Sequence, residues 1–360
     1  MNNSTSFSQC EQEHQISLKP ILYSAEACKL GIYNNKPMEI YLRNDLENEN
    51  LHASIRDQAI KYFNVRNIPW HSVGHLISSQ SCCVNLVFPF MQHPDQLKSV
   101  LQKLGYPVKE VLPFELDILN RLHTAGWKLN LDSNPREQCP PHYIAFEWIG
   151  AKNYLRELRG PNVCGDTTRG RGHRFSSVDF AVRFRQTDGR IQIVMSEWKY
   201  TESYPENNSK QTSDTGTDRL ERIYRQSLDK SDCQIRLPCG VKYEDLFFDP
   251  FDQMMRHQLL TSAMQREQEM GADIVSYLHI APKANTELVK RITSPKLKRL
   301  GNSIYEVWHQ LVVPGRFQHC FLEDFLKAAV SHAPNEGWAD FVTRRYEGVA
   351  ASVKSSKLGK

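Results

Sequence analysis

The feature that most constrains this chain is a pair of apolar segments joined by a short turn, over residues 176–200. Apolar residues recur at every second position of the first segment: Val178, Phe180, Val182 and Phe184. This two-residue period is typical of a β-strand. A second apolar segment follows at 191–198, and the sequence Thr187-Asp188-Gly189 between them is rich in turn-forming residues. The region therefore predicts a β-hairpin.

The length of the turn decides which residues of the hairpin face each other. A two-residue Asp-Gly turn would place Glu197 opposite an apolar residue. A three-residue turn closed by Gly189, which can take the left-handed conformation, places Val182 opposite Val194 and Asp179 opposite Glu197. A slip of one residue moves every side chain to the other face. We favour the three-residue turn, because it pairs apolar with apolar and charged with charged residues.

Two acidic side chains at facing positions repel each other unless a proton or a cation lies between them. A hard divalent cation, which prefers oxygen ligands, suits Asp179 and Glu197. Lys199 lies two residues after Glu197, so both side chains point to the same side of the sheet. An isolated Glu-x-Lys is ordinarily a surface ion pair worth about 0–1 kcal/mol. The facing Asp179 favours a reaction site instead.

The combination of Asp179 with Glu197-Trp198-Lys199 across a hairpin resembles the PD-(D/E)XK nuclease superfamily. The longer run "SSVDFAVRF…IVMSEWKYTESY" is similar to a group of largely uncharacterised bacterial restriction-endonuclease-like proteins. Three further stretches fit that group: "HLISSQSCCVNLVFPF", "YIAFEWIGAKNYLRELRG" and "DPFDQMMRHQLL". The resemblance covers about residues 70 to 280. One departure is Val178, which stands where the superfamily motif has proline.

The resemblance implies an α/β fold with a restriction-endonuclease-like core, in which helices flank a mixed central sheet. It implies Mg²⁺, with Mn²⁺ able to substitute, held by Asp179, Glu197 and the backbone carbonyl of Trp198. Lys199 would orient or deprotonate the attacking water and balance charge on the transition state. The expected activity is hydrolysis of phosphodiester bonds, with DNA as the expected substrate and RNA not excluded. The alternative is a catalytically weak nucleic-acid-binding module on the same fold.

The superfamily often has a further acid, contributed by a helix before the hairpin, and two residues match the closer group. Glu147 lies among aromatic and aliphatic residues, where an unpaired carboxylate is costly. Glu157 lies beside arginines and has a simpler explanation as a solvated ion pair. We rank Glu147 first, and the sequence leaves both open.

Two segments are candidates for contacts with nucleic acid. The loop "GDTTRGRGHRF" leads into the Asp179 strand and carries four basic residues: Arg169, Arg171, His173 and Arg174. Lysine and arginine contacts to phosphate give affinity that does not depend on sequence, so this loop could clamp the phosphate backbone. On the helix predicted after residue 250, Gln253, Arg256 and His257 lie off the apolar stripe and could face the active site. Simple solvent exposure is the alternative for both segments.

The organisation of the 360 residues follows from local composition. We expect a disordered start at 1–16, a mainly helical region at 17–125, a nuclease-like core at 126–285, a helical extension at 286–346 and a flexible basic tail at 347–360. No run approaches the roughly 18 apolar residues of a membrane span. The missing secretory signal and the odd count of nine cysteines favour the cytoplasm. The net charge of +4 permits nucleic acid as a partner, and a dimer remains open.

Overall fold

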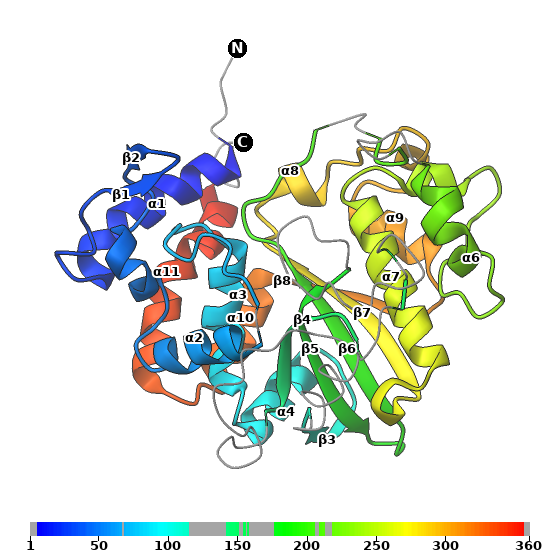
Figure 1. Ribbon diagram of the computed structural model, residues 1–360, viewed down its shortest axis with the longest axis horizontal. Coiled ribbons are helices and arrows are strands. Elements are labelled where there is room, and N and C mark those ends of the chain that lie inside the picture. The colour runs from blue at the N-terminus through cyan, green and yellow to red at the C-terminus, as the bar shows by residue number, and fades with distance from the viewer. Residues whose placement is uncertain are drawn as a thin grey trace.

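The computed structural model describes residues 6–66, 68–114, 142–150, 154–155, 157, 176–205, 209–212 and 218–355, with side chains as far as residue 348. A central β-sheet lies between two groups of helices (Figure 1). The strands are β1 (Gly31–Tyr33), β2 (Lys36–Met38), β3 (Val108–Leu112), β4 (Ile144–Trp148), β5 (Val178–Gln186), β6 (Ile191–Trp198), β7 (Ile274–Ala281) and β8 (Phe317–Phe321).

The helices before the sheet are α1 (Phe7–Leu22), α2 (Arg56–Val65), α3 (Ser79–Val87) and α4 (Pro94–Lys103). Those that follow β6 are α6 (Arg225–Leu228), α7 (Phe251–Arg266), α8 (Thr286–Val289), α9 (Ile304–Leu311), α10 (Leu322–Ser331) and α11 (Glu336–Ser355). A π-helical turn, Leu220–Tyr224, runs directly into α6. Leu97 and Val100 lie one turn apart on α4, and both are buried.

The sheet is mixed and has the order β3-β5-β6-β7-β8, with β4 pairing to β5 as well. Strand β5 is antiparallel to β6, β3 and β4, whereas β6–β7 and β7–β8 are parallel pairs. β4 pairs with the first half of β5, from Val178 to Val182, and β3 pairs with its second half. The beginning of β5 is therefore held between β4 and β6.

The β5–β6 hairpin has the predicted three-residue turn. Gly189 takes a φ of +92°, and the Gln186 N–H donates to the Arg190 carbonyl at 2.8 Å. Val182 pairs with Val194, which confirms the predicted register. The ladder ends with the pair Phe180 and Ser196, so Asp179 and Glu197 occupy the next positions on their strands.

Each face of the sheet has its own apolar core. Alternate residues of β5 and β6, among them Val182 and Val194, pack against α2, α3, α4, α10 and α11. The residues between them, Ala181 and Met195, pack against α6, α7, α8 and α9 on the other face. Figure 1 shows the same layers, with α1 and α11 on one side of the sheet and α7 and α9 on the other. The predicted α/β fold with a mixed central sheet flanked by helices is confirmed.

Several expectations about the two ends of the chain were wrong. Residues 7–16, expected to be disordered, form the first part of α1, in which Glu11, Gln15 and Lys19 are buried. Helix α11 continues to Ser355 and so covers most of the tail expected to be flexible at 347–360. The region expected to be mainly helical also contains the short strands β1 to β3, and the C-terminal helical extension contains β8. Among the helices that the structure describes, none has both the length and the apolar character needed to cross a membrane.

Candidate active site

The residues of the predicted motif meet where β5 begins and β6 ends. The Trp198 N–H donates to Asp179 Oδ2 at 2.6 Å, so the two strands are joined there by a side chain instead of by the backbone ladder. Lys199 follows directly and its own N–H donates to the Ile280 carbonyl of β7 at 2.8 Å. The paired ends of β5 and β6 therefore hold Asp179, Glu197 and Lys199 close together.

Glu147 lies at the position of β4 that faces Asp179. Its neighbours Phe146 and Trp148 pair with Phe180 and Val178, which leaves Glu147 opposite the residue between them. The resemblance implied that this acid lies on a helix, and that expectation was wrong because Glu147 belongs to strand β4. Its carboxylate accepts hydrogen bonds from Ser177 Oγ at 3.0 Å and from Gln80 Nε2 of α3 at 3.3 Å. Three adjacent strands thus each present one carboxylate to the same region.

The electrostatic environment of Asp179 reflects this crowding. Burial raises the pKa of the Asp179 carboxyl well above its ordinary value, and the negative charges of Glu197 and Glu147 raise it further. The positive charge of Lys199 and the hydrogen bond from Trp198 N–H oppose that rise without cancelling it. The site therefore has more negative charge than its protein contacts neutralise, which favours a bound proton or cation.

Glu197 and Lys199 form a buried ion pair and not a surface pair. Lys199 Nζ lies 2.6 Å from Glu197 Oε1, and the two side chains are only 9% and 5% exposed. Burial alone would lower the pKa of Lys199, but the charges of Glu197, Glu202 and Asp179 together with Tyr204 outweigh it, so the pKa is raised. The ammonium group is therefore charged at neutral pH, which suits it to orient water and balance negative charge.

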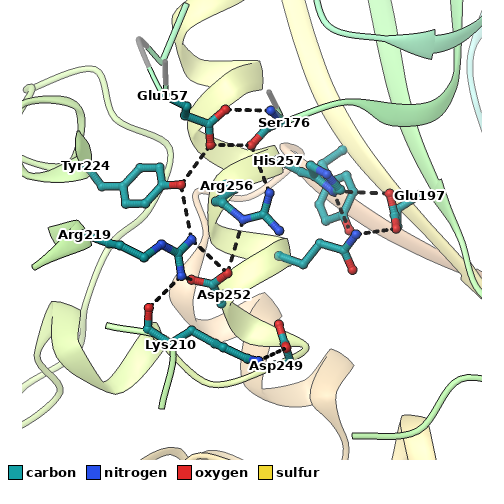
Figure 2. Close-up of polar contacts among 12 residues, drawn as sticks. Glu157, Ser176, Glu197, Lys210, Arg219, Tyr224, Asp249, Asp252, Arg256 and His257 are labelled. Atoms are coloured by element: carbon teal, nitrogen blue, oxygen red, sulfur yellow. Dashed lines mark hydrogen bonds and ion pairs between the residues drawn. The ribbon is translucent and has the colours of Figure 1, made fainter. Parts of the chain in front are cut away.

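Helix α7 supplies two more partners of Glu197. Gln253 Nε2 donates to Glu197 Oε1 at 2.7 Å, and His257 Nδ1 lies 3.6 Å from Glu197 Oε2. Burial, aided by the positive charges of Arg256 and Lys199, lowers the pKa of His257 well below its ordinary value, so the ring is neutral. Gln253 and His257 are one helical turn apart on α7, and both contact Glu197. Figure 2 shows His257 pointing toward Glu197.

Beside the site lies a closed ring of hydrogen bonds and ion pairs (Figure 2). Its members, in order, are Glu157, Tyr224, Arg219, Asp252, Arg256 and Ser176. Glu157 accepts three hydrogen bonds within this ring, from the N–H and Oγ of Ser176 and from Tyr224 OH. Arg256 Nε lies 3.2 Å from Asp252 Oδ2, and its Nη1 donates to Ser176 Oγ at 3.2 Å.

The contacts in and around this ring distinguish residues between which the sequence did not decide. Glu147 acts on the pKa of Asp179, whereas Glu157 holds Ser176, three residues before Asp179. Gln253 contacts the motif directly, whereas Arg256 is committed to Asp252 and Ser176. No local pattern marks Gln80 and Ser177 as supporting side chains, because their partner Glu147 lies 67 and 30 residues away in the chain. The basic loop with Arg169, Arg171, His173 and Arg174 lies outside the described residues.

The chemistry of the donor set fits a hard cation. Asp179 and Glu197 offer carboxylate oxygens, and the raised pKa of Asp179 marks an excess of negative charge. Within the described part of the chain, no group of three or more His, Cys, Asp or Glu residues is arranged to hold a metal ion. Mg²⁺ is usually bound through one or two carboxylates, with water and substrate phosphate as the remaining ligands. The two carboxylates of Asp179 and Glu197 are therefore enough protein ligands to bind Mg²⁺.

Comparison with known proteins gives one match. A family model described as "Restriction Endonuclease associating with ARP" matches residues 11–347, which is nearly the whole chain and includes every element around the site. No curated protein and no solved structure matches the chain. Since the match extends from α1 to α11, this protein belongs to the family of restriction endonucleases described as associating with ARP.

Proposed function

We propose that this protein is a cytoplasmic, Mg²⁺-dependent nuclease of the PD-(D/E)XK type that hydrolyses phosphodiester bonds in DNA. The observation that carries the proposal is the meeting of Asp179, Glu197 and Lys199 at the ends of two paired strands, with Trp198 N–H bound to Asp179. The family match supports a nuclease-like function. Two acidic groups and one charged lysine, held on rigid elements, suit a reaction in which negative charge develops on phosphate oxygens.

The proposal gives each residue of the site a role. Asp179, Glu197 and the Trp198 carbonyl would hold Mg²⁺, for which Mn²⁺ can substitute, and Glu147 would be the further acid. A bound divalent ion lowers the pKa of a ligated water and neutralises charge on phosphate. The Lys199 ammonium orients the attacking water and stabilises the charge of the transition state. Gln253 fixes the Glu197 carboxylate at 2.7 Å, so that its oxygens keep one orientation.

The basic loop before β5 is proposed to bind the phosphate backbone. Replacing Arg169, Arg171 and Arg174 together with alanine should weaken DNA binding and flatten its dependence on salt, by about one unit of slope for each lost phosphate contact. Fluorescence anisotropy with labelled DNA at several salt concentrations measures this slope. A slope equal to that of the wild type would remove the loop from the interface.

A cleavage assay tests the proposed activity. Supercoiled, linear and single-stranded DNA, and RNA, are incubated with the purified protein in Mg²⁺, Mn²⁺ or EDTA. The proposal predicts cleavage of DNA that needs a metal ion and is lost in Asp179→Asn and Glu197→Gln. Failure to cleave any of these substrates, with DNA binding retained, would contradict the nuclease and favour a binding module on the same fold.

A further inference from the structure

Two histidines on the far side of the sheet form a second cluster of metal-ligating side chains. His309 lies on α9 and His319 on β8, at the opposite edge of the sheet from β4. His309 Nε2 lies 3.3 Å from His319 Nδ1. His309 is exposed and His319 is half-buried, so an ion in solution can reach them. Neither residue has a role in the proposed cleavage.

The two rings are held in place by aromatic neighbours. The His319 ring is stacked on Tyr305, with centroids 4.2 Å apart and planes at 11°. Tyr305 is itself fixed, because its hydroxyl lies 3.0 Å from Nδ1 of the buried His279. His309 packs against Phe317 with centroids 4.9 Å apart. These contacts on α9 and β8 fix the distance between the two ring nitrogens. Ligands that are fixed in advance lose less entropy when they bind a metal ion.

The distance matches the edge of a tetrahedral metal site. With Zn–N bonds of about 2.0–2.1 Å, two ligands of a tetrahedron are about 3.3–3.4 Å apart. The same distance also fits a hydrogen bond in which one ring donates to the other, and a bound metal ion would take the place of that hydrogen bond. Burial lowers the pKa of both His309 and His319, and each ring therefore keeps a lone pair at neutral pH. Neutral imidazole suits zinc, nickel and copper, whereas carboxylate and water suit magnesium.

We propose that His309 and His319 together bind one transition-metal ion, of which Zn²⁺ is the best match. In the described part of the chain no third His, Cys, Asp or Glu joins them, so water or a solution ligand would complete the coordination. The ion would tie α9 to β8, and this inference does not depend on the proposed nuclease activity. The site differs from the Asp179–Glu197 site in ligand type, and the two sites should therefore prefer different metals.

Calorimetric titration of the full chain with Ni²⁺, in a large excess of Mg²⁺, tests this site. Excess Mg²⁺ occupies the carboxylate site, and Ni²⁺ reports on imidazole ligands. Wild type should bind one Ni²⁺ ion with an affinity that falls at least tenfold in His309→Gln and in His319→Gln. His93→Gln, which changes an exposed histidine elsewhere, should bind Ni²⁺ as wild type does.

A melting experiment on the same variants gives a second measurement. Zn²⁺ should raise the melting temperature of wild type and His93→Gln, and should leave both site variants unchanged, since binding stabilises only a fold that holds the ion. His309 is exposed, so His309→Gln should fold without metal as wild type does. Unchanged Ni²⁺ affinity in the two site variants, or an equal loss in His93→Gln, would overturn the proposal.

Discussion

Glu147 adopts an unusual backbone conformation at the centre of the candidate site. Its φ is +47°, in the left-handed region, although it lies inside β4. For a residue other than glycine this costs on the order of 1–2 kcal/mol. Such strain persists only where the surrounding structure fixes it, and it is concentrated at functional sites. Gln80 and Ser177 hold the carboxylate in place, and its charge acts on Asp179.

Substitution by glutamine distinguishes Glu147 from Glu157. Glu147→Gln keeps the shape and removes one charge beside Asp179; its amide oxygen can still accept from Gln80, while its amide nitrogen would donate to the Ser177 hydroxyl. We expect the fold to persist and cleavage to fall by tenfold or more. Glu157→Gln should instead lower stability by about 1–3 kcal/mol, because this buried acceptor of three hydrogen bonds loses part of its hydrogen bonding.

The measurement is the DNA cleavage rate of each variant beside its chemical unfolding curve, at a temperature where both are folded. One outcome would show that Glu157, and not Glu147, is the acid of the site. That outcome is wild-type cleavage by Glu147→Gln, together with lost cleavage and unchanged stability in Glu157→Gln.

At the level of elements, the β5–β6 hairpin sets the register of the site through its turn. Gly189 has a φ of +92°, and a Cβ added there would meet nothing within 4 Å. A substitution therefore tests backbone conformation alone. Gly189→Ala should destabilise the protein by about 1 kcal/mol, and Gly189→Asn should cost less because asparagine tolerates the left-handed region.

Urea unfolding of the two variants measures this difference, and cleavage by the folded variants should be unchanged. A Gly189→Ala variant as stable as wild type would show that the turn does not depend on this conformation.

The hairpin could be predicted from the sequence because its pattern is local. Alternation, turn residues and apolar matching all lie within about twenty-five residues and agree with one another. Glu147 was placed on the wrong kind of element because the resemblance implied a helix, and a short apolar run such as Ile144–Trp148 does not by itself distinguish a strand from a buried helix. Strand β8 was missed for another reason. It is five residues long and completes the sheet only by pairing with β7.

At the scale of the whole molecule, both ends of the chain fold onto the segment that follows the motif. Tyr200, next to Lys199, is buried, and its hydroxyl donates to Glu11 and accepts from Gln15 Nε2 of α1 at 3.1 Å. Gln15 Nε2 also lies 2.8 Å from the carbonyl of Arg345 on α11. These partners are up to 330 residues apart in the sequence. The polar composition of α1 therefore suggested disorder when it was viewed without them.

Acid should destabilise the whole molecule through histidines that are buried in the neutral form. Burial lowers the pKa of His75 from its ordinary value of 6.5 to about 4, and His142 shows the same change. Between pH 6.5 and about 4 the unfolded chain binds protons that the folded chain does not. The free energy of unfolding therefore falls as the pH falls through this window.

Substitution of His75 should make that fall shallower. The His75 ring is stacked on Tyr41, with centroids 4.5 Å apart, so His75→Gln also loses some packing. The informative quantity is therefore the slope of stability against pH and not its value at one pH. Urea unfolding at half-unit intervals from pH 4 to pH 7 measures the slope, with the exposed His93→Gln as the control. An identical slope in wild type and His75→Gln would contradict this explanation.

Lys199 provides the most direct test that the motif is catalytic, because the alternative is a structural ion pair with Glu197. Lys199→Arg keeps the charge and the pair, and it should stay close to wild type in its melting curve. A planar guanidinium does not replace a compact ammonium at the attacking water. Lys199→Ala leaves Glu197 buried without its 2.6 Å partner and should lose stability as well. The rates are therefore compared at a temperature where every variant is folded.

The deciding measurement is the single-turnover rate of DNA cleavage in Mg²⁺ for wild type, Lys199→Arg and Lys199→Ala. We predict metal-dependent cleavage by wild type, a rate about 10²–10⁴-fold lower for Lys199→Ala, and incomplete recovery in Lys199→Arg despite its stable fold. Cleavage at the wild-type rate by folded Lys199→Ala would show that Lys199 serves only the ion pair, and would contradict the catalytic site.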